Sequence, residues 1–128
     1  MAASRLHRGR RGQLGQPIPI VAPEGSAAGW FVPSVDGDLI VGFHHLEPDL
    51  QPRRWSEFAT AVQARSWVDP GAIAEVASGA LQAGETLGTP FLTYDRNPDR
   101  LAWRVPVGGP AGSGAVMVAG GVAWRDVR

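Results

Sequence analysis

The sequence predicts an α+β fold in which a mostly antiparallel β-sheet packs against one main α-helix. Three observations support this. The 128 residues include 17 glycines and 11 prolines, which favour turns and short strands over a helical bundle. One segment spaces its apolar residues as a helix does, and several others alternate apolar and polar residues as half-buried strands do. The length allows one domain with a core of modest size.

Residues 1–16 are expected to form a flexible arm, and residues 17–128 a single α+β domain. The arm holds Arg5, Arg8, Arg10 and Arg11, and no acidic residue precedes Glu24. Such an arm could touch nucleic acid. However, 12 basic residues balance 12 acidic ones in the whole chain, so no net field attracts DNA or RNA. We therefore expect a solvated arm and no nucleic-acid partner.

The first strands are expected on either side of Asp36-Gly37, because this dipeptide separates the apolar runs "GWFVPSV" and "DLIVGFHHL". The next segment, "QPRRWSEFATAVQARSW", allows two interpretations. Phe58, Ala61 and Val62 follow helical spacing after Ser56, whereas "PRRWSEF" equally suits a strand. The spacing slightly favours a helix.

The main helix is predicted in "DPGAIAEVASGALQAG". Asp69 can cap it and Pro70 suits its first position, while Gly84 marks its end. An apolar stripe then falls at i, i+3, i+4, i+7 and i+8, on Ile73, Val76, Ala77, Ala80 and Leu81. This stripe requires a sheet to cover it.

Antiparallel strands are expected after the helix. "PFLTY" and "RLAWRVPV" flank a reverse turn at "DRNPD", and the second run alternates cleanly. The glycine-rich "GGPAGSG" is expected to be a mobile loop. In "AVMVAGGVAWR", the Gly120-Gly121 pair suits a last tight hairpin.

Residues 67–124 resemble a PepSY-type module, the helix-then-strands unit found in protease propeptides. The likeness is carried by "DPGAIAEVASGAL" as the helix, "PFLTYDRNPDRLAWRVPV" as the first strand pair and "AVMVAGGVAW" as the last strand. The last strand lacks the Asp-x-x-Thr-Gly ending usual in that family. The resemblance implies a binding, inhibitory or chaperone-like module without catalytic residues.

The composition excludes several chemistries. The chain has no cysteine and no lysine, so thiolate catalysis, cysteine-ligated metals, Schiff bases and a complete phosphate-binding P-loop are absent from it. We expect no cofactor. No apolar run is long enough to span a bilayer, and the N-terminus makes a poor export signal, so we expect no membrane association and a cytoplasmic location, with export only if a signal was trimmed. Arginine- and alanine-rich usage is typical of high-GC bacterial genomes.

The candidate catalytic residues lie in "VGFHHLEPDL". Because neighbouring side chains alternate along a strand, His44 and His45 should lie on opposite faces and cannot chelate one ion. His7 falls in the arm, so no metal site is expected. His45 and Glu47 could form an acid-base pair that faces a cavity, with His44 as the other candidate. The alternative is that these residues have no function and are simply exposed to water at the end of a strand.

Five tryptophans are many for so short a chain. They could line a pocket for a flat apolar ligand, or they could form the core. The candidate ligand-binding residues are Trp30, Trp103, Tyr94 and Arg104, with the arginine as a cationic rim.

The leading hypothesis for function is a small non-catalytic binding module, PepSY-like, that presents a sheet face or groove to an unknown protein partner or small ligand. Exposed strand edges favour a homodimer. The alternative hypothesis is a small enzyme acting on an apolar ligand in a tryptophan-lined cavity, with a His/Glu acid-base pair.

Overall fold

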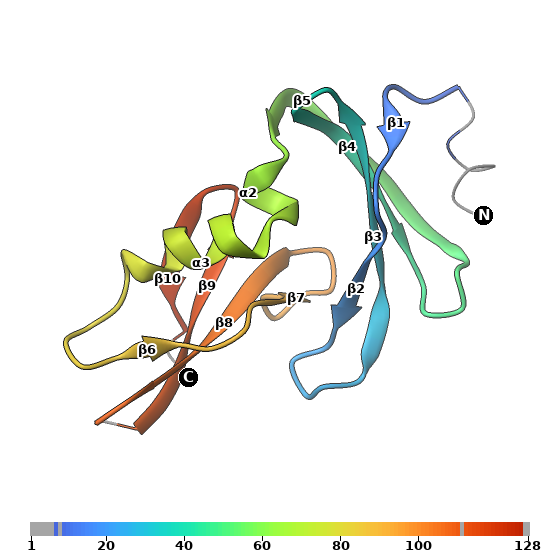
Figure 1. Ribbon diagram of the computed structural model, residues 1–128. Helices are drawn as coiled ribbons and strands as arrows, with labels where there is room; N and C mark the ends of the chain where they lie inside the picture. The colour runs from blue at the N-terminus through green and yellow to red at the C-terminus, as the bar shows by residue number, and fades with distance from the viewer. Residues whose placement is uncertain (1–6, 8, 111, 127–128) are drawn as a thin grey trace. The chain divides into compact units, whose positions relative to one another are not determined.

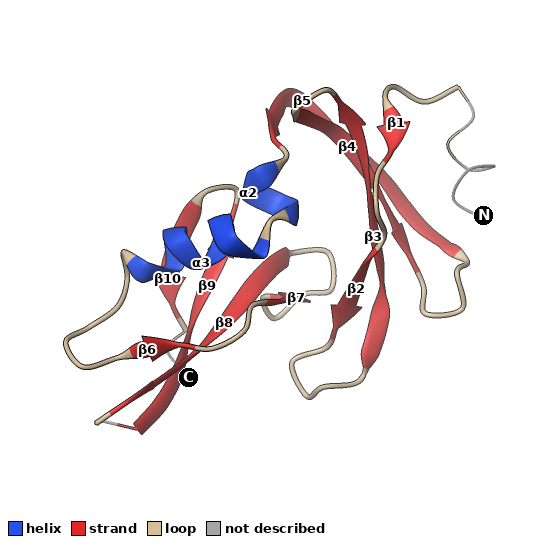
Figure 2. Cartoon of the chain, viewed as in Figure 1, coloured by secondary structure: helices blue, strands red, loops and turns tan. Residues whose placement is uncertain are grey.

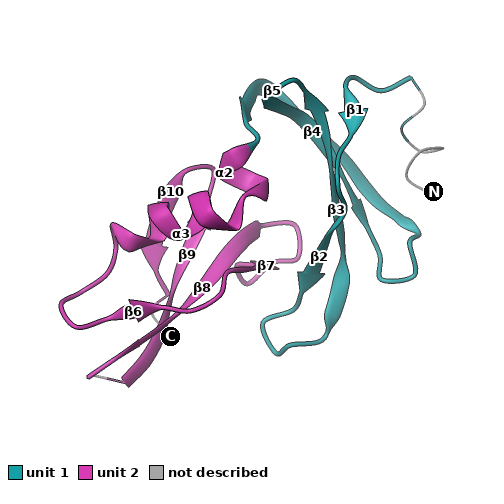
Figure 3. Ribbon diagram, in the orientation of Figure 1, with its two compact units in different colours: residues 1–64 teal, residues 65–128 magenta. Residues whose placement is uncertain are grey.

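The structure, a computed structural model, describes residues 7, 9–110 and 112–126 and contains two compact units, residues 1–64 and 65–128 (Figure 3). Strands make up 53% of the described residues and helices 11% (Figure 2). The predicted α+β class, with a sheet packed against one main helix, is therefore wrong, and the fold is mostly β with two short helices. The division into an arm and one domain stays a prediction.

Unit 1 is an antiparallel arrangement of strands around β3 (Figure 1). The described strands of this unit are β1 (Gln13–Leu14), β2 (Ile18–Val21), β3 (Ala27–Asp36), β4 (Leu39–Leu46) and β5 (Pro52–Gln63). One edge of β3 pairs with β4, which pairs in turn with β5. Its other edge pairs with β2 along one half and with β1 along the other.

The predicted hairpin across Asp36-Gly37 is confirmed. Asp36 pairs with Leu39, so the loop consists of Gly37 and Asp38. Gly37 has a φ of 60°, which the tight hairpin turn requires and which glycine adopts without steric cost.

The helix favoured for the segment after β4 is wrong, and its strand alternative is right. This segment forms β5 up to Gln63, and only Arg65–Val68 is helical, as α2. Pairing with β4 outweighs the weak helical spacing because it places the Phe58 ring against Phe43, with centroids 5.8 Å apart.

Part of the predicted flexible arm is ordered against β3. Residues 1–6 and 8 lie outside the described residues. Gln13 and Leu14 form β1, opposite Val35 and Ser34. Leu14 packs against the buried pair Val32 and Leu46, so apolar burial holds this end of the arm in place.

Unit 2 combines α2 and α3 (Pro70–Ser78) with antiparallel strands. The described strands are β6 (Thr86–Leu87), β7 (Phe91–Tyr94), β8 (Leu101–Gly109), β9 (Gly112–Ala119) and β10 (Val122–Arg125). Helix α3 contacts β6, β8, β9 and β10. Its predicted start is confirmed, because the Asp69 carboxylate accepts a hydrogen bond from the Gly71 amide and Pro70 follows it. It ends at Ser78, earlier than the stripe predicted.

The predicted mobile loop "GGPAGSG" belongs largely to two strands. β8 runs to Gly109 and β9 starts at Gly112, and these two residues pair. The predicted Gly120-Gly121 hairpin is confirmed by β9 and β10, and both glycines have positive φ. Among the described residues, no helix combines the length and apolar character needed to cross a membrane.

Candidate functional site

His44 and His45 lie on opposite faces of β4, as the strand period predicts. His44 is paired with Val32 and Trp55, whereas His45 is paired with Phe31 and Arg54. Both are buried, with 3% and 2% of their surface exposed. The alternative expectation, that His44 and His45 are exposed to water at the end of a strand, is therefore wrong. Each buried imidazole needs hydrogen-bond partners inside the protein.

Glu47 has a different partner from the one predicted. Its Oε1 lies 3.4 Å from Nη1 of Arg53, and its side chain is 41% exposed. An exposed pair of this kind contributes little to stability. The carboxylate proposed to orient His45 is thus engaged by Arg53 at the start of β5.

The His44 side chain is held by a hydrogen bond to His7 of the arm. His44 Nε2 lies 2.9 Å from His7 Nδ1, and His7 Nε2 lies 3.0 Å from the Gly12 carbonyl oxygen and 3.2 Å from Ser34 Oγ. The Ser34 hydroxyl donates to the Arg11 carbonyl at 2.5 Å. Because carbonyls only accept, Nε2 of a neutral His7 carries the proton. His44 Nε2 must then donate to His7.

This proton arrangement leaves Nδ1 of His44 with a lone pair. Among the described residues, the only hydrogen bond of the His44 side chain is the one to His7. Nδ1 is therefore the nitrogen at which this imidazole can accept a proton or a hydrogen bond.

Three rings form a cluster on this face of unit 1, which we call the ring cluster (His7, His44 and Trp55). The centroids of His44 and Trp55 lie 4.6 Å apart, and His7 lies 5.1 Å and 5.5 Å from the two. Gly42 leaves space for the Trp55 ring, because a Cβ at position 42 would lie only 2.7 Å from Cη2 of Trp55. The guanidinium carbon of Arg10 lies 5.5 Å from the indole centroid, within cation–π range.

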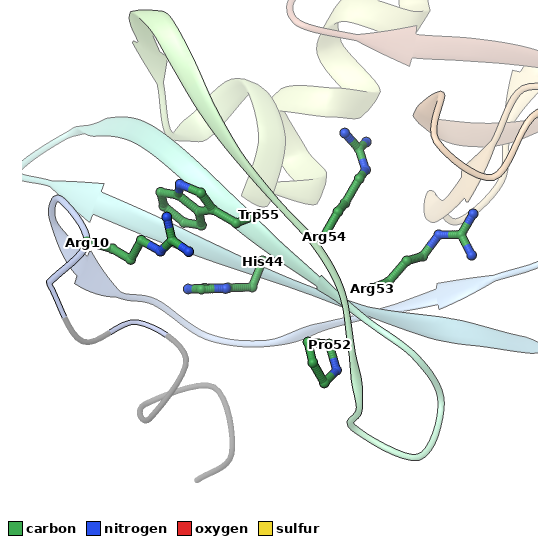
Figure 4. Close-up of a pocket in the computed structure, with 6 residues that line it drawn as sticks. All are labelled: Arg10, His44, Pro52, Arg53, Arg54 and Trp55. Carbon is green, nitrogen blue, oxygen red and sulfur yellow. The ribbon is translucent and has the colours of Figure 1, made fainter.

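A cavity of about 140 Å³ opens beside the ring cluster, and we call it the His44 cavity. Its lining residues are Arg10, His44, Pro52, Arg53, Arg54 and Trp55. Figure 4 shows the side chains of Arg10, His44 and Trp55 gathered together, whereas those of Arg53 and Arg54 point away from them. The lining contains no carboxylate, so the cavity is cationic.

The environment of His44 keeps its imidazole neutral at pH 7. Burial, reinforced by the nearby His7 and Arg10, lowers the pKa of His44 to about 4. The lone pair on Nδ1 is thus present over the physiological pH range.

A second cavity of about 180 Å³ lies on the same unit and is lined only by apolar residues, so we call it the apolar cavity. Its lining residues are Pro17, Trp30, Val32, Leu46 and Leu50. Trp30 was predicted to bind ligand and lines this cavity.

The other predicted ligand-binding residues lie in unit 2. Trp103 is buried, and its indole N–H donates a hydrogen bond to the Trp67 carbonyl oxygen at 2.9 Å. The polar atom of this side chain is therefore used in a structural hydrogen bond. Tyr94 is half-buried at the end of β7. Arg104 pairs with Asp126. Trp103 and Arg104 are neighbours in β8 and occupy opposite faces of the strand, as the alternation predicts. The ligand-binding role of these residues stays a prediction.

No cluster of three or more His, Asp or Glu side chains that could hold a metal is found in the described part of the chain. Comparison of the chain with protein-family models, with curated proteins and with solved structures found no match.

Two residues of the site, His7 and Arg10, were not predicted from the sequence, because they were assigned to the solvated arm. Trp55 was one of the five tryptophans that could line a pocket, but its segment was expected to be helical. The only signal that these three residues share is a basic or aromatic side chain that could reach a histidine-bearing strand. Pairing across 37 residues, as between His7 and His44, leaves no local pattern to detect.

Proposed function

We propose that the protein is a binding module that holds a small carboxylate ligand in the His44 cavity. The observation that carries this proposal is the position of Arg10, whose guanidinium lies over Trp55 in a lining without carboxylates. Arg10 forms no ion pair within the described residues. A planar guanidinium recognises a carboxylate through two parallel hydrogen bonds, and a nearby indole limits its hydration.

Several contacts keep this site in place before a ligand arrives. The hydrogen bonds of His7 to His44, Gly12 and Ser34 hold the arm against β3 and β4 close to Arg10. A site that is already ordered loses less conformational entropy on binding. The predicted PepSY-like character of residues 67–124, the protein partner and the homodimer remain predictions.

The test is a titration with butyrate followed by NMR, with the Trp55 indole N–H signal as the local probe. Wild type should show a saturable shift of this signal. The variant R10Q should bind roughly tenfold to a hundredfold more weakly, because a charged hydrogen bond is lost. R11Q is the matched control, since Arg11 is exposed, adjacent in sequence and outside the cavity lining. Equal affinities of wild type and R10Q would rule the proposal out.

A second candidate is an enzyme that uses His44 as a general base. The observation in its favour is the His7–His44 hydrogen bond, which orients the imidazole and leaves Nδ1 in its basic form. Here His7, and not the predicted Glu47, is the orienting residue. Hydrolysis of p-nitrophenyl butyrate should then depend on His44, with a kcat/KM that falls below about pH 4. Identical rates for wild type and H44Q would reject this candidate.

A further inference from the structure

The His44 cavity and the apolar cavity are neighbours on one face of unit 1. Val32 pairs with His44 across β3 and β4, and Leu46 pairs with Pro52 across β4 and β5. In each pair one residue lines the apolar cavity and the other lines the His44 cavity. Side chains directly opposite in a sheet have Cβ atoms only about 4.5–5.5 Å apart, so the two cavities adjoin.

The apolar cavity has a floor and exposed walls. Val32 and Leu46 are buried and packed together, and they form the floor. Trp30 packs against them as a partly exposed wall, and Leu50 forms another wall with 43% of its surface exposed. Leu50 is one of few large apolar residues left so exposed among those described. An apolar group seated here would shield both walls from water.

The volume of the apolar cavity limits the size of this group. A water molecule occupies about 30 Å³ in the liquid, so a cavity of about 180 Å³ has space for about six small non-hydrogen atoms. A short alkyl chain fits this space, whereas a folded peptide segment or a two-chain lipid does not.

We propose that the ligand is a free amphiphilic carboxylate with one short alkyl chain. The carboxylate binds Arg10 in the His44 cavity, and the chain lies over Val32 and Leu46 between Trp30 and Leu50. This assignment rests on the proposed function, because it takes the Arg10 site as the place of the charged group. The alkyl chain attached to the carboxylate then runs from the His44 cavity into the neighbouring apolar cavity.

The experiment measures dissociation constants for acetate, butyrate, hexanoate and octanoate, with hexanol as the uncharged probe. Affinity should rise about fourfold for each added methylene, because each CH₂ leaves water, until a chain of about six carbons fills the cavity. Hexanol should bind far more weakly than hexanoate. Vesicles of phosphatidylcholine should show no binding.

Two matched variants test the binding of the alkyl chain separately from the binding of the carboxylate. L50N removes one wall of the apolar cavity, and asparagine suits the φ of 73° at this position, so the loop should keep its fold. This variant should bind octanoate about tenfold more weakly than wild type does, and its affinity for acetate should not change. L39N carries the same change at an exposed leucine of β4 that lines neither cavity, and it should bind all probes as wild type does.

The outcomes distinguish the two proposals. Binding that depends on Arg10 but not on chain length, or that is equal in wild type and L50N, overturns the alkyl chain and leaves the carboxylate site standing. If no probe binds more weakly to R10Q than to wild type, the carboxylate site itself is overturned. Preferential binding of vesicles overturns the free single-chain ligand in favour of a lipid surface.

Discussion

His44 lies where burial, a neighbouring imidazole and a guanidinium act on one titratable ring. All three disfavour its protonated form, and its pKa falls to about 4. The groups that face it are His7, through the hydrogen bond to Nε2, and Arg10 beside Trp55. The same contacts that define the candidate site therefore couple the stability of unit 1 to pH.

The pH dependence of stability follows from this shift. The folded-state pKa lies below the unfolded value of 6.5, so the unfolded chain takes up the proton first as pH falls. The contribution of His44 is fully present above about pH 6.5 and is lost as pH falls toward 4. Between pH 7 and pH 5 the loss should be about 2 kcal/mol. Urea unfolding of wild type and H44Q at both values measures it, and an equal decline in the two proteins would contradict it.

Gly42 should tolerate no side chain. A Cβ at this position would lie 2.6 Å from the Ser56 carbonyl oxygen and 2.7 Å from the Trp55 indole. We expect G42A to lower the free energy of unfolding by about 1–3 kcal/mol through overpacking. G114A is the control, because a Cβ at Gly114 meets nothing within 4 Å, and it should be neutral or slightly stabilising. The pair is compared by urea denaturation, and similar stabilities would show that Trp55 moves aside freely.

At the scale of elements, an ion pair ties the last strand to the segment after α3. Arg125 of β10 donates from Nη1 and Nη2 to the two carboxylate oxygens of Glu85, at 2.7 and 2.9 Å. Its Nη1 also lies 3.3 Å from the Ala80 carbonyl oxygen. Hydrogen bonding from Arg125, then from the Gln82 amide, lowers the pKa of Glu85. This bidentate contact fixes the segment that follows α3 to β10.

The variant E85Q should therefore melt at a lower temperature than wild type. The wild-type advantage is present above the unfolded pKa of 4.5 and should fade as pH falls through the lower folded value. E75Q is the control, since Glu75 is 78% exposed and lies 3.7 Å from Arg65. Thermal unfolding followed by circular dichroism compares the three proteins, and equal melting temperatures at pH 7 for E85Q and E75Q would be inconsistent with this role.

The elements with strong local signals were predictable from the sequence. The Asp36-Gly37 and Gly120-Gly121 hairpins and the start of α3 at Asp69 each depend on the backbone preferences of one to three residues. The segment of β5 was not predictable, because its helical spacing is weak and its strand is fixed by pairing with β4. The end of α3 at Ser78 likewise depends on contacts that the apolar stripe does not reveal.

At the scale of the whole molecule, the strand content was underestimated for a related reason. Glycine-rich stretches such as the one around Gly109 and Gly112 looked like loops, yet they pair as strand ends. The candidate site was predictable only in part: His44 was named and its face was correctly separated from that of His45. Its partners His7 and Arg10 come from a remote segment and could not be inferred from local pattern.

The pairing of β3 also bears on self-association. Because β1 and β2 share one edge of this strand, the arm occupies backbone donors and acceptors that would otherwise be available to another chain. Deletion of residues 1–16 removes β1 and should therefore leave the part of this edge that pairs with β1 free to pair with another chain. Light scattering should then report aggregates that grow with protein concentration for the trimmed chain but not for the intact chain, making integrity of the arm a determinant of solubility.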